Sequence, residues 1–348
     1  MPELFVTNFN RNFTGVSATA ANVIRQQVKS HDLALIGHPL PGCPDPIPLA
    51  TARALSRTPQ GGREFSIWHV RRNPEMRAAI WARDVLRLPV RIVFTSAALR
   101  YHSAYPRWLI SRMDAVIATT EQAAEFVPHV RAVVAHGVDT DMFCPSPDRS
   151  GDWIKQGFGG LRGIATIGRI RPEKGSDLFV DAMLRLLPQH PDCVALLVGK
   201  ATAKHQSFLQ GLKDKVRAAG LTDRLLFPGE VPAQDLPALM RALSLVIQLP
   251  RYEGYGMAPL EGMASGVPFI GSEAGYYQAF CAQGKAGLIV AQEAAAQAAE
   301  AAHALLSDAE RLATMGAAAR DIAQYSFSAA KEAAGIEKVY QQVLTQDA

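Results

Sequence analysis

The sequence predicts an α/β protein built from two doubly wound parallel-sheet domains. Three observations lead to this prediction: a length of 348 residues with 48% hydrophobic and 20% charged residues, short apolar runs that alternate with helical stretches, and a proline-rich break near the middle. The length suffices for two cores of ordinary size. Short apolar strands separated by helices are typical of parallel sheets covered on both faces.

Twelve apolar runs are expected to be strands, six on each side of the break. Those of the first half are Leu4–Phe9, Leu33–Gly37, Phe65–Val70, Ile92–Ser96, Ala115–Thr119 and Ala132–Ala135. Those of the second half are Gly163–Ile167, Val194–Gly199, Leu225–Pro228, Ser244–Leu249, Phe269–Ser272 and Leu288–Val290. Each half is therefore expected to form one parallel sheet, and ligands of such sheets bind at the carboxyl ends of the strands.

The segments outside these strands have distinct compositions. The break, residues 144–151 (CPSPDRSG), has the composition of a linker and predicts domains at residues 1–150 and 151–325. Residues 39–48 contain five prolines, so we expect a loop there and neither a helix nor a central strand. The alanine-rich tail, from Gln292 through Leu344, is expected to be helical.

The composition excludes several classes of protein. No apolar run approaches the roughly 18–20 residues of a membrane helix, and the start MPELFV lacks the basic and apolar regions of a signal peptide. The four cysteines are scattered, with neither a Cys-x-x-Cys pair nor a histidine at zinc spacing. They are expected to be reduced thiols of a cytoplasmic protein.

Positive charge is concentrated in the first half of the chain. Residues 1–150 carry 17 Lys and Arg against 12 Asp and Glu, whereas residues 151–348 carry 19 against 20. From Arg53 to Arg112 there are twelve arginines, three acids and no lysine. This bias favours an acidic partner, or else reflects a solvated face with local ion pairs. Nucleic acid is not the expected partner, because interleaved aromatics and a recognisable binding module are lacking.

Two glutamates, Glu253 and Glu261, lie eight positions apart around a glycine-rich bend. The bend, residues 253–256 (EGYG), follows a predicted strand and leads into a predicted helix. Its glycines allow close approach of the backbone to a ligand, and free amides at the helix start can hold an anion. The carboxylates can accept hydrogen bonds from a polyhydroxylated ligand. The alternative is that Glu261 is a surface residue of the helix and Glu253 is part of an ordinary turn.

Two cations, Arg169 and Lys174, lie in the loop that follows another predicted strand. Together they can neutralise a diphosphate and stabilise the charge that builds up on it as it leaves. The alternative is that Lys174 pairs with Glu173 or with solvent.

Three segments together resemble the retaining glycosyltransferases of family 4. Residues 253–261 are similar to the family's Glu-x(7)-Glu motif, residues 168–175 (GRIRPEKG) to its Gly-Arg-x(4)-Lys-Gly loop, and residues 134–145 (VAHGVDTDMFCP) to its Asn-Gly-Val-Asp-x-x-x-Phe-x-Pro segment. They occur in the family's order and span most of the chain. The resemblance implies the GT-B fold, in which two Rossmann-like doubly wound parallel-sheet domains face each other across a cleft.

The same resemblance implies a division of labour. Residues 1–150 are expected to bind the acceptor, residues 151–325 the nucleotide sugar, and a helix within residues 326–348 to cross back to the first domain. The pair Asp139 and Asp141 has the spacing of a metal motif, but it lies in the segment that is structural in this family. We therefore expect no metal ion and no cofactor, only a nucleotide-sugar co-substrate.

The resemblance also implies roles for single residues. The family's first glutamate orients the transferred sugar and its second the ribose, which implies these roles for Glu253 and Glu261. The expected catalytic residues are then Arg169, Lys174 and Glu253. The further donor-binding positions are a glycine loop, a basic residue at a strand end, a backbone contact to the base and the bend before the helix, namely Gly15, Lys200, Val231, Gly254, Tyr255 and Gly256.

The acceptor-binding residues are expected in the arginine-rich half. The family often places a site histidine after the fourth strand of the first domain, but this chain has Ser96 there and His102 six residues later. His102 and His69 are alternatives for that role, and either could instead be structural. Together with nearby arginines, the candidates are His69, Arg71, Arg72, Arg100 and His102.

Parts of the first half also resemble the lipopolysaccharide core mannosyltransferases of alphaproteobacteria. These parts are residues 13–19 (FTGVSAT), 94–102 (FTSAALRYH) and 108–119 (WLISRMDAVIAT). The resemblance implies transfer of mannose from GDP-mannose to the lipopolysaccharide inner core, an anionic Kdo-bearing lipid acceptor, and peripheral contact with the cytoplasmic face of the inner membrane. The alternative is a family 4 enzyme that uses a UDP- or ADP-sugar, with a soluble sugar phosphate or another glycan as acceptor.

Overall fold

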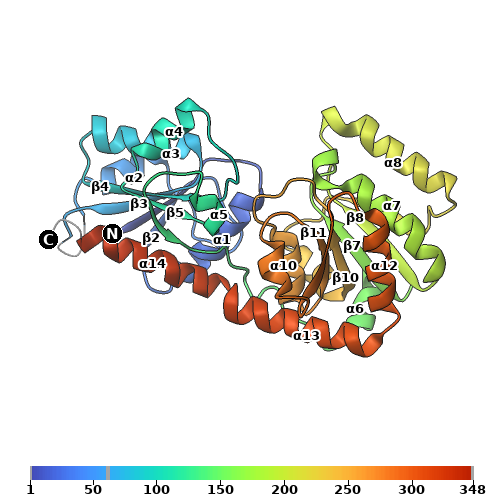
Figure 1. Cartoon of the computed structure of the whole chain (residues 1–348). Helices are drawn as coiled ribbons and strands as arrows, with labels where there is room; N and C mark the ends of the chain where they lie inside the picture. The colour runs from blue at the N-terminus through green and yellow to red at the C-terminus, as the bar shows by residue number, and fades with distance from the viewer. Residues whose placement is uncertain (1, 60–62, 346–348) are drawn as a thin grey trace. The chain divides into compact units, whose positions relative to one another are not determined.

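The computed structural model describes residues 2–59 and 63–345. The chain divides into two compact units (Figure 1). Unit 1 comprises Met1–Gly137 and Phe327–Ala348, and unit 2 comprises Val138–Ser326. None of the described helices is long and apolar enough to cross a membrane.

Unit 1 is built on a six-stranded parallel sheet with the strand order β2-β1-β3-β4-β5-β6. Its strands are β1 (Leu4–Asn8), β2 (Leu33–Gly37), β3 (Ser66–Val70), β4 (Val90–Ser96), β5 (Ala115–Ala118) and β6 (Val130–Val133). The order reverses at β1, which is the topology of a doubly wound sheet.

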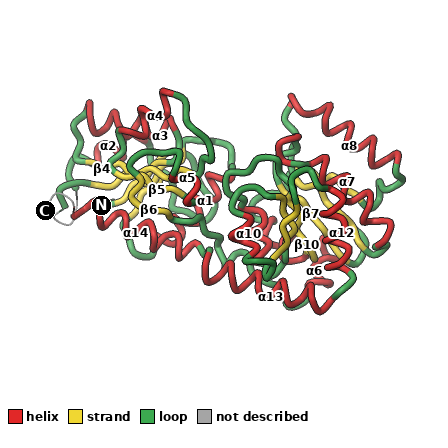
Figure 2. The backbone as a smooth tube through the Cα atoms, viewed as in Figure 1, coloured by secondary structure: helices red, strands yellow, loops and turns green. Residues whose placement is uncertain are grey.

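Helices cover both faces of this sheet, as Figure 2 shows. One face is covered by α1 (Gly15–Gln27) and α14 (Ala329–Thr345), which come from opposite ends of the chain. Ile336, Val339, Tyr340 and Val343 form the helical stripe that α14 buries on this face. The other face carries α2 (Leu49–Leu55), α3 (Asn73–Ile80) with its π-helical extension η1 (Trp81–Val85), and α4 (Ala104–Ser111); α5 (Glu121–Ala124) follows β5.

Glu332 anchors α14 to the rest of unit 1. Its carboxylate lies 2.7 Å from Nδ1 of His136 and accepts the backbone N–H of Gly137, also at 2.7 Å. Both contacts are buried, and His136 therefore serves as a local hydrogen-bonding residue.

Unit 2 is built on a second six-stranded parallel sheet, with the order β12-β11-β10-β7-β8-β9. Its strands are β7 (Arg162–Ile167), β8 (Cys193–Val198), β9 (Leu225–Gly229), β10 (Leu243–Gln248), β11 (Phe269–Ser272) and β12 (Gly287–Val290). The helices are α6 (Arg149–Gln156), α7 (Ser176–Leu186), α8 (Gln206–Ala218), α9 (Leu236–Ala242), α10 (Met257–Ala264), α11 (Tyr277–Cys281), α12 (Ala295–Leu306) and α13 (Ala309–Ser326), with the 3-10 turns η2 (Pro172–Lys174), η3 (Leu187–Gln189) and η4 (Ala203–His205).

The predicted strands are confirmed, each within two residues of its expected bounds. The expected linker, by contrast, is wrong in its second half, because α6 begins at Arg149. The side chain of Asp148 caps this helix by accepting the N–H of Gly151 at 2.9 Å. Trp153, 1% exposed, then packs on Gly163, where an added Cβ would lie 2.1 Å from the indole ring. This segment is therefore part of the core of unit 2.

Candidate functional site

The residues predicted to bind the donor, apart from Gly15 of unit 1, lie at one edge of the sheet of unit 2. Strands β10, β7, β8 and β9 are consecutive neighbours in this sheet. The loops that leave their carboxyl ends carry Glu253, Arg169, Lys200 and Val231 in that order. Because the strands are parallel, all four loops emerge at the same edge, where ligands of open α/β sheets bind.

Backbone hydrogen bonds join these loops to one another. The amide of Gly168 donates to Val198 at 3.0 Å, and the amide of Ile170 donates to Lys200 at 3.1 Å. The amide of Gly199 in turn donates to Gly229 at 2.8 Å. The exposed side chains of Arg169 and Lys200 are thus carried on neighbouring loops whose backbones are fixed.

Lys174 and Glu253, predicted from separate motifs, form an ion pair. The Lys174 ammonium lies 2.5 Å from the Glu253 carboxylate, whose other oxygen accepts the N–H of Gly254 at 3.0 Å. Their loops meet because Gly175 adopts φ +66°, and any Cβ there would lie 1.8 Å from the carbonyl oxygen of Leu249. Lys174 thus pairs with Glu253, and Glu173 is not its partner.

Arg251 joins the same two loops and was not predicted from the sequence. Its guanidinium donates to both oxygens of Asp177 at 2.8 Å, to both oxygens of Glu293 at 2.5 and 2.8 Å, and to the carbonyl of Pro172 at 2.6 Å. Its backbone N–H also donates to Glu173 at 3.0 Å. A bidentate guanidinium fixes geometry as well as charge, so Arg251 holds the Lys174 loop against the Glu253 loop.

Glu261 lies in the second turn of α10 and is 8% exposed. Burial raises the pKa of its carboxyl group to about 7. No described residue donates to this carboxyl, so its oxygens are available to hydroxyl groups of a ligand. The residue before the helix, Gly256, has φ +109° and provides no side-chain cap, so the first amides of α10 are also available.

Tyr255 lies within the bend but points into the protein. It is 4% exposed and stacks on Tyr276 with ring centroids 5.5 Å apart, and its ring also meets the ring of Phe280 edge-on. This packing supports the bend from beneath. The backbone of Gly254 and Tyr255, more than the tyrosine ring, is therefore suited to a ligand contact.

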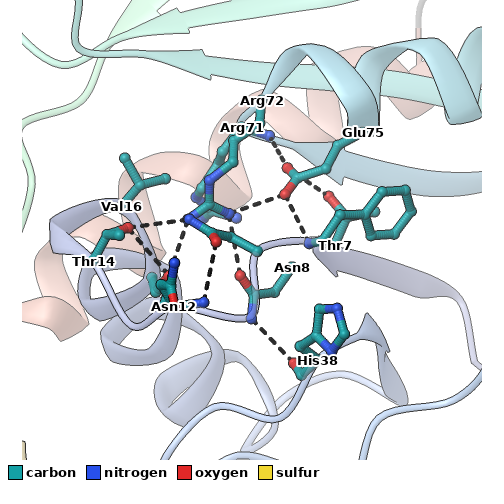
Figure 3. Close-up of polar contacts among 12 residues, drawn as sticks. Thr7, Asn8, Asn12, Thr14, Val16, His38, Arg71, Arg72 and Glu75 are labelled. Atoms are coloured by element: carbon teal, nitrogen blue, oxygen red, sulfur yellow. Dashed lines mark hydrogen bonds and ion pairs between the residues drawn. The ribbon is translucent and has the colours of Figure 1, made fainter.

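In unit 1 a polar network surrounds the start of α1, where Gly15 lies. Arg72 donates to Asn8 at 3.1 Å, to Thr14 at 3.3 Å and to Ser17 at 2.9 Å, and pairs with Glu75 at 3.0 Å (Figure 3). The network fixes the start of α1 at the carboxyl end of β1. Gly15 itself is exposed, with open space where a Cβ would lie.

The acceptor candidates of unit 1 differ in accessibility. His69 is completely buried, its ring nitrogens lie 2.6 Å from the Tyr340 hydroxyl and 2.7 Å from the Thr95 hydroxyl, and burial holds its pKa well below the ordinary value. We therefore assign His69 to the core. His102 is half-buried on the loop after β4, and its Nε2 is buried without a partner. Arg100 is exposed on the same loop, whereas Arg71 is buried.

One group in unit 2 brings together potential metal ligands, although the sequence predicted no such group. Atoms of His190, Asp192 and Cys193 lie within 4.8 Å of one another. Asp192 already has a cationic partner, because Arg162 donates to both of its carboxylate oxygens at 2.6 and 3.1 Å. Burial also raises the pKa of Cys193 to about 11, so the thiol stays protonated. The ion pair between Arg162 and Asp192 therefore accounts for the charge of this group without a metal ion.

Comparison with known proteins shows the family of the chain. Residues 155–322, most of unit 2, match the family described as Glycosyl transferases group 1. The chain is 38% identical over 346 residues to the lipopolysaccharide core biosynthesis mannosyltransferase LpcC of Rhizobium leguminosarum bv. viciae, covering 98% of this chain and 97% of that protein. It is also 38% identical over 351 residues to the corresponding enzyme LpsB of Rhizobium meliloti (strain 1021), covering 98% of each.

A solved structure shows the same fold over the whole chain. It is that of Anabaena Alr3699/HepE in complex with UDP and glucose, with a TM-score of 0.82 at 17% identity, covering 98% of this chain and 100% of that chain. The fold is therefore that of GT-B glycosyltransferases, with two Rossmann-like units. With relatives this similar over their full length, the chain belongs to the group 1 glycosyltransferases and is a glycosyltransferase.

Proposed function

We propose that the protein is a retaining mannosyltransferase that transfers mannose from GDP-mannose to the lipopolysaccharide inner core. The observation that carries this proposal is the 38% identity, over nearly the whole chain, to two enzymes named as lipopolysaccharide core mannosyltransferases. The proposed acceptor is an anionic, Kdo-bearing lipid, which suits the excess of arginine in unit 1.

We assign the donor to the sheet edge of unit 2. Arg169 and Lys174 neutralise the diphosphate and stabilise it as the leaving group. A diphosphate competes with Glu253 for Lys174, so donor binding frees the Glu253 carboxylate to orient the mannose. Glu261 accepts hydrogen bonds from the ribose, and the backbone near Val231 contacts the base.

The proposed reaction retains the configuration of the sugar without a protein nucleophile. An oxygen of the donor phosphate accepts the proton of the attacking acceptor hydroxyl, and this hydroxyl attacks from the face that the diphosphate leaves. Positioning and charge stabilisation then supply the rate enhancement. This scheme gives Glu253 an orienting role, consistent with its ion pair to Lys174.

We also propose that one face of unit 1 contacts the membrane. Helices α3, η1 and α4 pack together and, with the residues next to them, expose several large apolar side chains: Trp81 (51% exposed), Val85 (53%), Leu86 (44%), Tyr105 (52%) and Trp108 (52%). Four arginines on or beside these helices are also exposed: Arg77, Arg87, Arg107 and Arg112. Apolar and aromatic side chains among arginines favour binding to an anionic lipid surface.

The alternative function keeps the family and changes the substrates, to a UDP- or ADP-sugar and a soluble sugar phosphate or other glycan. Transfer assays with GDP-, UDP- and ADP-sugars, each with and without a Kdo-bearing lipid, separate the two. We expect product with GDP-mannose that depends on the lipid. A product that forms only with a soluble sugar phosphate would support the alternative.

A further inference from the structure

Arg71 has an unusual environment for an arginine. Its side chain is 8% exposed, and all three guanidinium nitrogens are buried without a hydrogen-bond partner. Within residues 2–59 and 63–345 no other arginine has all its side-chain nitrogens in this state. The neighbouring Arg72, by contrast, bonds to four side chains of unit 1.

The hydrogen-bond acceptors near Arg71 are all bonded to other groups. The two oxygens of Glu75 accept from Thr7, Phe9, Arg72 and the backbone, not the side chain, of Arg71. The two oxygens of Glu332 are taken by His136 and Gly137. The Tyr340 hydroxyl is bonded to Gln27 and His69. The guanidinium therefore has charged neighbours but no described group that accepts its hydrogens.

An unpaired buried charge is costly, and arginine cannot avoid the cost by losing its proton. Burial does lower the pKa of Arg71, but from a starting value of 12.5, and the guanidinium stays protonated in proteins. Proteins keep buried charges paired because an uncompensated one destabilises the fold. An anion from outside the chain, bound at Arg71, would offset this cost.

The position of Arg71 in the sheet suits a ligand. It follows β3 directly, at the carboxyl edge of the sheet of unit 1, where ligands of such sheets bind. By strand alternation it lies on the same face as Ile67 and His69, the face covered by α1 and α14. Thr119, just after β5, lies on this face too, and its hydroxyl is likewise buried without a partner.

We propose that Arg71 binds an oxyanion of the substrate through its guanidinium fork, most simply the carboxylate of an acidic acceptor sugar. This proposal rests on the proposed function and adds to it, because it assigns recognition of the anionic acceptor to one of the twelve arginines between Arg53 and Arg112. A phosphate of the donor presents the same chemistry and is the second source of such an anion. Because the guanidinium is covered in the free protein, binding requires the long side chain to swing outward or its cover to open.

Substitution of Arg71 separates this role from a structural one. In Arg71→Met the unpaired charge is replaced by an apolar chain, so the melting temperature is expected to stay the same or rise by about 2–4 °C. The KM for the Kdo-bearing acceptor is expected to rise about 10- to 100-fold, since a charge-assisted hydrogen bond is lost, and Arg71→Lys should be intermediate. Arg72→Met is the matched control: it loses four partners, and its melting temperature is expected to fall.

Binding measurements identify the source of the anion without relying on transfer. The thermal shift of the wild type with free Kdo, inorganic phosphate and GDP is compared with that of Arg71→Met. If Arg71→Met loses only the shift caused by Kdo, the anion is the acceptor carboxylate. If it loses the shifts caused by phosphate and GDP, the anion is a phosphate of the donor. Either result supports the oxyanion site even if the enzyme transfers a different sugar. The proposal is overturned if all shifts and both substrate KM values are unchanged in Arg71→Met, or if its melting temperature falls as far as in Arg72→Met.

Discussion

Replacing Arg251 with alanine removes the side chain that joins the loops of Lys174 and Glu253. Four hydrogen bonds to Asp177 and Glu293 and one to Pro172 are lost, and two carboxylates are left without their cation. Because Arg251 is about 30% exposed, solvent replaces part of this interaction, and we expect a loss of about 1–2 kcal/mol in the free energy of unfolding. The melting temperature of a protein of this size falls by about 2–4 °C for each kcal/mol.

The effect on catalysis is expected to exceed the effect on stability. Arg251 touches neither the donor nor the acceptor in our assignment, but a displacement of about 1 Å between catalytic groups can cost about 100-fold in rate. We expect Arg251→Ala to lower kcat about 10- to 100-fold in a GDP-mannose transfer assay. Arg251→Lys should recover only part of the lost kcat, because an ammonium cannot bridge both carboxylates bidentately.

Arg217→Ala provides the matched control in the same unit. Arg217 pairs with Asp214 on the surface, and both side chains are more than half exposed. Its removal should leave kcat unchanged and the free energy of unfolding within about 0.5 kcal/mol. The role given to Arg251 is refuted if Arg251→Ala turns over as fast as Arg217→Ala.

Three further predictions concern single contacts of the site and the fold. The pKa of Glu261 is raised to about 7 in the folded state from 4.5, so its ionisation adds no destabilisation below pH 4.5 and destabilises the ligand-free protein by up to about 3 kcal/mol above pH 7. Urea titrations of Glu261→Gln should therefore show a shallower fall in stability between pH 4.5 and 7 than those of the wild type. Equal slopes would contradict the buried carboxyl. Lys174→Ala and Glu253→Ala should each abolish most transfer while circular dichroism stays native-like, and wild-type turnover in either would overturn the site assignment. Glu332→Ala should cost about 3–5 kcal/mol in chemical denaturation, because it removes two buried contacts of a carboxylate, one to His136 and one to the amide of Gly137. A loss below about 1 kcal/mol would show that α14 is held by apolar packing alone.

Regular structure was the most predictable part of this chain. Buried parallel strands are continuous apolar runs, so they stand out in the sequence without knowledge of their partners. The segment around Arg149 was predicted to be a linker but begins a helix. Proline, serine and aspartate are common both in linkers and at helix starts. Its Asp148 is a helix cap, and only the packing of Trp153 shows that the helix belongs to unit 2.

The candidate site was predictable only where a short motif carries it. Lys174 and Glu253 lie in two such motifs, although nothing in the sequence shows that they form an ion pair. Arg251 precedes Glu253 by two residues, but its partners Asp177 and Glu293 are 74 and 42 positions away. The sequence also does not show that the Arg71 guanidinium lacks a hydrogen-bond partner, because this depends on which other groups the neighbouring carboxylates bind. Contacts between residues far apart in the sequence can be identified only once the fold is known.

The proposed function is tested most directly by the product of one reaction. The purified enzyme is incubated with GDP-mannose and a Kdo-bearing lipid acceptor, and the linkage of the product is determined by NMR. Because the mannose of GDP-mannose is α-linked and the reaction is proposed to retain configuration, we predict an α-mannosyl product that forms only with the lipid acceptor and is lost in Glu253→Ala. A β-linked product, or transfer only from a UDP- or ADP-sugar, would contradict the account.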